Sequence, residues 1–305
     1  MNSGQLKRLT SVAVVAVVLS ALGAMPANAA IAGSTSTIDT LVVHGLVSLN
    51  SNAKVQAVAA TGVEVSTLAG LVVPTKTGTV SIAPVSATAA TVVTRDVITY
   101  DTTSPSYDFA VTRAGDSAKA NAAYVVINDA SAPDDYRFTV TVNGGPAQLE
   151  LMNGIVFIKD ASGTAVNFLQ APWVEDATGR QLATSYSVNG TTVTQHVNHA
   201  GASYPVVADP ATACDALNCT VEFSKSETRQ AASSSGLAAV LFTTACTLLG
   251  AEIGAFVCGA YSAWMIDTAN QAQNQGKCLG VRAIHYPIGI AASPYPVVYS
   301  GGNCR

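Results

Sequence analysis

The sequence has few charged side chains, and this shortage excludes several classes of partner. Charged residues make up 11% of the 305 residues, and 15 basic against 19 acidic side chains give a net charge of −4. Proteins that bind nucleic acids or anionic lipids carry a surplus of basic charge. We therefore expect no nucleic-acid partner. The apolar content of 49% argues against wholesale disorder.

Motifs for nucleophilic or metal-dependent catalysis are also missing. There is no Gly-x-Ser-x-Gly elbow, no His-Glu-x-x-His and no phosphate loop with Gly-Lys-Ser/Thr. A triad assembled from distant residues stays open, because triads are defined by geometry, but the chain has only four histidines. The sequence therefore predicts no catalytic residue, no cofactor and no metal site, and enzyme activity is the less favoured interpretation.

Cysteine is missing from the first 213 residues, and its later distribution divides the chain. An even number of cysteines in an exported protein predicts disulfides, although six cysteines allow many pairings. No two are spaced as C-x-x-C, so zinc binding explains the cysteines less well than disulfides do. Neighbours in the sequence are the pairs that we favour: Cys214 with Cys219, Cys246 with Cys258, and Cys278 with Cys304.

The N-terminus has the three parts of a secretory signal peptide over residues 1–29. Lys7 and Arg8 precede an apolar run of about 15 residues, which ends in Ala27-x-Ala29. Since a stable membrane span needs about 20 residues, a retained anchor is the weaker alternative. We expect cleavage after Ala29 and a secreted, extracellular protein. Removal of the leader leaves 13 basic and 19 acidic residues, a net charge of −6.

Residues 30–209 are predicted to form an antiparallel β domain, either a sandwich or a barrel. Between residues 120 and 210, short alternating strands are separated by turn dipeptides about ten residues apart. Residues 30–119 give weaker signals, and we read TLVVHGLVSL, GVEVSTLAGLVV and GTVSIAPV as strands of the same domain. Residues 114–119 are expected to be an exposed loop. The turn signals are Asn143-Gly144, Asn153-Gly154, Asn189-Gly190, Asp160 to Gly163 and Asp176 to Gly179.

Residues 210–305 are predicted to form a disulfide-stapled helical hairpin with an extended tail, which makes the whole chain α+β. A serine cap at Ser226 precedes apolar residues repeated at three and four positions, and the pattern resumes after Gly250. A Cys246–Cys258 bridge would close the hairpin, and Cys278–Cys304 would hold a proline-marked tail that is not helical.

Three stretches also support a resemblance. They are APWVED (residues 171–176), YPVVADP (204–210), and the terminal layout of Cys246, Cys258, GKCL (276–279) and YSGGNC (299–304). Over residues 120–305 the chain resembles an uncharacterised family of secreted actinobacterial proteins. The resemblance implies export and a β domain joined to a C-terminal part, and it transfers no catalytic residue.

Two histidines three residues apart, His196 and His199, are a candidate metal or catalytic site. On a strand, side chains at i and i+3 point to opposite faces. His196 should lie with Thr192 and Thr194, and His199 with the apolar valines. One metal ion could not reach both, so we favour a structural role at the end of the β domain, near Asp209.

Acidic residues give two further candidates. Glu175 and Asp176 should diverge on a strand, and we expect a solvated turn in preference to an acid and base pair. Asp134 and Asp135 beside Asp129 offer oxygen ligands for calcium, but no EF-hand spacing supports this and a solvated loop is favoured.

The favoured function is a secreted, non-catalytic binding protein with an unknown extracellular or cell-surface partner. The first alternative is a membrane-active, toxin-like effector acting through residues 231–266, where Glu252 is the charged side chain in a long apolar stretch. Serine and threonine dilute that stretch, so membrane contact is not favoured. The second alternative is an extracellular hydrolase that depends on His196 or His199.

Overall fold

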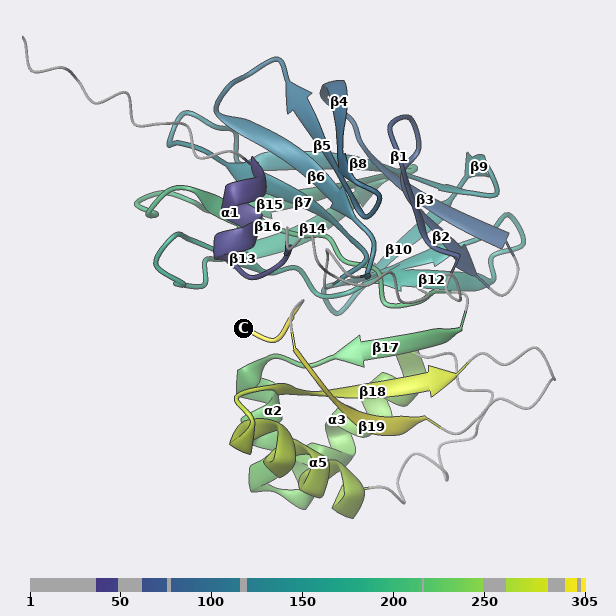
Figure 1. Cartoon of the computed structure of the whole chain (residues 1–305). Helices are drawn as coiled ribbons and strands as arrows, with labels where there is room; N and C mark the ends of the chain where they lie inside the picture. The colour runs from purple at the N-terminus through teal and green to yellow at the C-terminus, as the bar shows by residue number, and fades with distance from the viewer. Residues whose placement is uncertain are drawn as a thin grey trace, which may run out of the picture. The chain divides into compact units, whose positions relative to one another are not determined.

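The structure of this protein is a computed structural model. It describes residues 37–48, 62–75, 78–115, 120–215, 217–248, 262–284, 294–300 and 303–305. Most of these residues lie in antiparallel sheets, and the helices are few and short (Figure 1). The expected β domain with a smaller helical part is therefore present in outline.

The first large sheet is built from both halves of the predicted β domain. Its order is β1-β2-β3-β8-β15-β14, with β9 paired to β8. On β8, the buried side chains alternate with exposed ones, as expected for a strand with one face on a core. The strands are β1 (Glu64–Ser66), β2 (Gly70–Thr75), β3 (Gly78–Pro84), β8 (Asp135–Val142), β9 (Gly145–Pro146), β14 (Thr184–Asn189) and β15 (Thr192–Val197).

The second large sheet has β7 buried on both faces. Its order is β13-β16-β7-β6-β5-β4. The β7 sequence AAYVVI has six buried residues, because Val125 and Ile127 face the main core while Tyr124 and Val126 join a second cluster. The strands are β4 (Ala87–Thr94), β5 (Val97–Thr102), β6 (Tyr107–Thr112), β7 (Ala122–Ile127), β13 (Val174–Glu175) and β16 (Val206–Ala208).

The two large sheets share one hydrophobic core, which is the arrangement of a sandwich. Phe109 of β6 and Phe138 of β8 meet edge to face, with 5.5 Å between ring centroids. Val80 and Ile82 of β3 lie in the same core, so residues before position 120 are an integral part of the domain. The weak sequence signal there reflects small Ala, Thr and Val side chains.

Turn chemistry was read correctly from the sequence. Asn143 and Asn153 adopt φ angles of 52° and 53°, and each is followed by a glycine with positive φ. They join β8 to β9 and β10 to β11. Asn189 is instead the last residue of β14, without positive φ, and Gly190-Thr191 joins β14 to β15. A third sheet, in the order β10-β11-β12, consists of β10 (Gln148–Met152), β11 (Ile155–Lys159) and β12 (Ala165–Leu169).

The prediction of a strand at TLVVHGLVSL was wrong, because this segment begins in helix α1 (Thr37–Val43). Asp39 lies in the first turn, where an acidic side chain favours the helix dipole. The helix ends at Val43 and is followed by Gly45, whose φ of 67° allows the Leu46 N–H to donate to the Leu41 carbonyl. Leu41 and Leu46 are buried beside β7, and only this tertiary contact distinguishes the helix from a strand.

The C-terminal part combines helices with a further sheet. Strands β17 (Asn218–Glu222), β18 (Cys278–Ile284) and β19 (Tyr295–Tyr299) form that sheet in sequence order. Helices α2 (Lys225–Ser233), α3 (Ser235–Leu248) and α5 (Ser262–Asn274) contribute Ala231, Phe242 and Met265 to a core with the sheet (Figure 1). The predicted join of the hairpin near Gly250 lies outside the described residues.

The proline-marked tail is a pair of strands, not a simple extended segment. Leu279 of β18 pairs with Val298 of β19, and Val281 pairs with Pro296. Pro296 can occupy a strand because β19 is at the sheet edge. The structure contains the Cys214–Cys219 and Cys278–Cys304 disulfides. The predicted Cys246–Cys258 bridge cannot be followed, because Cys258 lies outside the described residues.

The serine cap was placed two residues too late. Ser224, not Ser226, is the N-cap of α2, and its side chain accepts a hydrogen bond from the Glu227 N–H. The Glu227 carboxylate accepts from the Ser224 N–H in return, at 2.7 Å. This capping box satisfies two N-terminal donors, and the sequence Ser224-x-x-Glu227 carried its signature.

Gly70 should tolerate a side chain much less well than Gly144, although both have positive φ. A Cβ added there would lie 2.1 Å from the Ile82 carbonyl oxygen, whereas one added at Gly144 would meet nothing within 4 Å. Their φ angles are similar, 71° and 74°. We expect Gly144→Ala to lower the free energy of unfolding by about 1–2 kcal/mol through backbone strain. Gly70→Ala should cost about 1–3 kcal/mol more, because of the clash.

Urea unfolding of the two variants measures this difference directly. Gly144→Ala is the matched control, because it carries the same backbone cost without the steric one. Equal urea midpoints for Gly70→Ala and Gly144→Ala would contradict the pairing of β2 with β3.

Candidate functional site

His196 lies on β15 of the first large sheet, whereas His199 lies two residues beyond the end of that strand, so the strand spacing describes His196 alone. His199 is 3% exposed, and its Nδ1 lies 2.7 Å from the Tyr204 hydroxyl. That hydroxyl donates to the His199 carbonyl at 3.0 Å. His199 Nε2 lies 3.2 Å from an Asp134 carboxylate oxygen. His199 is therefore part of a buried seam, while His196 projects from the outer face.

His196 contacts two side chains that the sequence did not connect with it. Its Nδ1 lies 2.6 Å from Asp135 Oδ1, and its Nε2 lies 2.7 Å from Ser187 Oγ. A carboxylate only accepts, so Nδ1 carries the proton that it donates to Asp135. In the neutral ring, Nε2 then accepts from the Ser187 hydroxyl. We call Ser187, His196 and Asp135 the triad.

Strand register explains why these three residues meet. In the pairing of β15 with β8, His196 is directly opposite Asp135. The Val197 N–H donates to the Asp134 carbonyl at 2.8 Å. Hydrogen-bonded pairs alternate along an antiparallel ladder, so His196 and Asp135 form a non-hydrogen-bonded pair, in which side chains are closest. Ser187 on β14 is the diagonal neighbour of His196, within reach of a long side chain.

Glu175 and Asp176 diverge as predicted, but they do not form a solvated turn. Asp176 is fully buried, and its carboxylate accepts hydrogen bonds from the Thr178 hydroxyl at 2.6 Å and from Arg180 Nε at 3.1 Å. The Thr178 hydrogen bond is the main reason that the pKa of Asp176 lies well below its usual value. This carboxylate closes the turn to Gly179 and cannot serve as a general acid.

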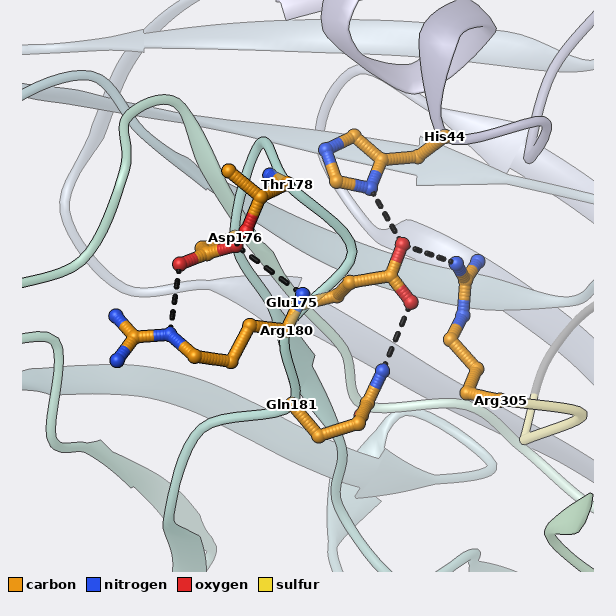
Figure 2. Close-up of polar contacts among 7 residues, drawn as sticks. All are labelled: His44, Glu175, Asp176, Thr178, Arg180, Gln181 and Arg305. Carbon is orange, nitrogen blue, oxygen red and sulfur yellow. Dashed lines mark hydrogen bonds and ion pairs between the residues drawn. The ribbon is translucent and has the colours of Figure 1, made fainter.

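Glu175 is held by three donors from distant parts of the chain (Figure 2). His44 Nδ1 lies 3.0 Å and Arg305 Nη1 2.9 Å from Oε1, and Gln181 Nε2 donates to Oε2 at 2.8 Å. Burial alone would raise the pKa of Glu175, but the hydrogen bonds from His44 and Arg305 outweigh it and lower the pKa. The cluster joins the segment after α1, β13 and the C-terminus.

Arg305 makes a second contact, with the face of Trp173. The guanidinium carbon lies 4.1 Å from the ring centroid, within the range of a cation–π interaction. The backbone N–H of Trp173 donates to Asp209 Oδ1 at 2.9 Å, so the Asp209 carboxyl fixes the segment entering β13. Asp209 is fully buried, and burial raises its pKa well above the usual value. These contacts hold β13, the segment entering it and Arg305 together.

The acidic residues considered for calcium do not converge. Asp129 accepts from the Ser131 N–H and hydroxyl, Asp134 faces His199, and Asp135 faces His196. In the ranges given above, no group of three or more His, Cys, Asp or Glu side chains could hold a metal ion.

The triad is the arrangement that sequence reasoning missed. Ser187 and Asp135 lie 9 and 61 residues from His196, and no motif connects them. The usable signal was the alternation of side chains along a strand, which correctly placed His196 on the outer face. Pairing of β14 and β8 with β15 was needed to find the other two.

The chain matches no protein-family model, and it has no significant match among curated proteins or solved structures.

A half-buried glutamate in the C-terminal part, Glu222, should make stability depend on pH. Burial raises the pKa of Glu222 from 4.5 to about 7, while the Asn303 N–H and Arg282 act in the opposite direction. The folded state therefore binds more protons than the unfolded state between pH 4.5 and 7, and the free energy of unfolding falls as pH rises through this window. Above about pH 7 this loss is complete.

We expect Glu222→Gln to remove about 1–3 kcal/mol of that loss. Glutamine keeps an acceptor for the Asn303 N–H but has no proton to lose. Urea unfolding at pH 5 and pH 8 measures the change, and Glu64→Gln on the exposed side of β1 is the control. A pH dependence in Glu222→Gln as steep as in the parent would contradict the prediction.

Proposed function

We propose that this is an exported interaction protein, which binds a partner polypeptide by adding an extended strand of that partner to β4. In the described part of the chain, β4 ends the second large sheet and pairs with β5 alone. The outer side of an edge strand carries backbone donors and acceptors that can pair with another strand. This open edge is the observation that supports the proposal.

The sequence of β4, ATAATVVT, suits strand addition. It contains no charge and no proline, which are the usual devices that protect an edge. Thr and Val favour extended backbone, and Val92 is 61% exposed. The ladder with β5 is irregular between Ala87 and Ala89 and between Val92 and Thr94. These bulges leave residues 89–92 as the regular segment available to a partner.

The partner chemistry follows from this segment. Backbone hydrogen bonds would supply affinity, and alternate side chains would supply specificity. An uncharged partner strand rich in β-branched residues matches the surface best. Acidic or basic strands would lose hydration without finding an opposite charge on β4.

Export is the second element of the proposal. It is supported by the three-part leader over residues 1–29, by the Cys214–Cys219 and Cys278–Cys304 disulfides, and by the resemblance to secreted actinobacterial proteins. The proposed domains remain a β domain over residues 30–209 and a disulfide-stapled helical hairpin with its tail over residues 210–305.

The membrane-active alternative has one observation in its favour. Leu237 and Val240 on α3 are 43% and 62% exposed. Among the residues that the structure describes, no helix is long and apolar enough to cross a membrane. Residues 249–261 of the proposed hairpin lie outside the described residues. Dye release from liposomes by the mature protein would favour this alternative.

Export predicts two properties of the mature protein. Its N-terminus should be Ala30, because the signal peptidase would cut after Ala29. No thiol should react under denaturing, non-reducing conditions, because all six cysteines are expected to be paired. Intact-mass analysis and a thiol assay of the protein recovered from culture medium measure both. A retained leader with reactive thiols would contradict export.

Strand addition predicts binding of a peptide with the sequence of β4. We expect a soluble, fluorescently labelled ATAATVVT peptide to bind the mature protein with a dissociation constant of about 0.1–1 mM, measured by fluorescence anisotropy. The same peptide N-methylated at alternate residues should not bind, because it lacks the backbone donors but keeps the side chains.

Two protein variants locate the binding site. Val92→Lys should abolish binding, because it places a charge on the regular segment of β4. Val85→Lys is the matched control, since Val85 is 45% exposed and lies outside β4. Undiminished binding to Val92→Lys, or equal binding of the N-methylated peptide, would rule out strand addition at this edge.

A further inference from the structure

The triad uses both nitrogens of His196 in the order found in serine hydrolases. Asp135 Oδ1 lies 2.6 Å from Nδ1, and Ser187 Oγ lies 2.7 Å from Nε2. In such enzymes the carboxylate fixes the ring tautomer, the imidazole acts as base, and the serine is the nucleophile. The three residues lie on adjacent strands, so the sheet, not flexible loops, fixes their spacing.

We propose that Ser187 is a nucleophile for short-chain esters, an activity that goes beyond strand binding. Ser187 Oγ attacks the acyl carbon while its proton passes to His196 Nε2. The tetrahedral adduct expels the alcohol, which takes that proton and leaves an acyl-serine. Water then attacks in the same way, and the carboxylic acid leaves. One ester and one water thus give one acid and one alcohol.

The surroundings of Ser187 select the size of the acyl group. Arg137 and Thr194 are polar neighbours of the triad on the same outer face, and neither provides an apolar wall for a long acyl chain. The side chains of His196 and Asp135 are 41% and 60% exposed. The site is therefore open, and it suits an acetyl-sized group that projects from a larger molecule.

The backbone donor that we assign to the developing oxyanion is the N–H of Val188, the residue after the nucleophile. The Asn198 N–H donates to the Ala183 carbonyl at 3.0 Å, which fixes the alternation along the β14–β15 ladder. Ser187 consequently belongs to a hydrogen-bonded pair, and the Val188 N–H points away from β15. Loss of one oxyanion donor typically costs about 10²–10³ in kcat, so a site with one such donor should turn over slowly.

Covalent labelling tests the nucleophile without requiring fast turnover. A fluorophosphonate probe transfers its phosphonyl group to an activated serine oxygen, with loss of fluoride and of the serine proton as HF. We expect the mature protein to be labelled at Ser187, as located by peptide mass spectrometry. Ser187→Ala should abolish the label. His196→Gln and Asp135→Asn should each reduce the labelling rate at least about tenfold.

Ser185→Ala is the matched control for this experiment. Ser185 is exposed on the same strand and face and is directly opposite His196 in the ladder, yet it is Ser187 that contacts the ring. Labelling should persist in this variant. Hydrolysis of p-nitrophenyl acetate should likewise fall at least about tenfold in Ser187→Ala and remain in Ser185→Ala.

The result separates a reactive triad from an ordinary surface contact. Exposed ion pairs contribute little to stability and need no third partner. No label at Ser187, or labelling that is unchanged in His196→Gln, would overturn the proposal. Val92→Lys should be labelled normally and Ser187→Ala should still bind the β4 peptide, so failure of one proposal leaves the other intact.

Discussion

The period of two along β8 and β15 is the constraint on which the rest of the structure depends. Phe138 and Val193 face the shared core on one side of the sheet. The residues that alternate with these two along each strand must then face outward. Strand pairing aligns those outward residues across β8, β15 and β14. Asp135, His196 and Ser187 meet for this reason. A shift of one residue in either pairing would destroy the core and the triad together.

The C-terminal residue connects the last segment of the chain to the β strands. Arg305 contacts both Glu175 and the face of Trp173. Its position near the Cys278–Cys304 disulfide places the guanidinium within a covalently held segment. Partial burial strengthens the ion pair between Arg305 and Glu175, but removal of either partner would leave a poorly hydrated charge. The large number of polar contacts around Glu175 thus reflects structural joining of segments, whereas the triad on the open face is accessible to solvent.

Prediction from sequence succeeded where local chemistry decides the structure. Asn143-Gly144 and Asn153-Gly154 form turns because both residues tolerate positive φ. The outward position of His196 on β15 follows from strand geometry. The prediction failed where packing decides: TLVVHGLVSL is partly helical, and Asp176 is buried within its own turn instead of solvated. In both cases an apolar surface or a set of donors elsewhere in the chain provides the missing stabilisation.

The sequence alone determined the alternation of buried and exposed strand positions, the turns and the grouping of the cysteines, because each depends on residues close together in the chain. Tertiary structure decided which strands pair, and therefore which polar residues meet. Ser187 and Asp135 are 52 residues apart and reach the same imidazole only after β14 and β8 have added to opposite sides of β15. Strand order is set by burial of the whole core, which no local pattern contains.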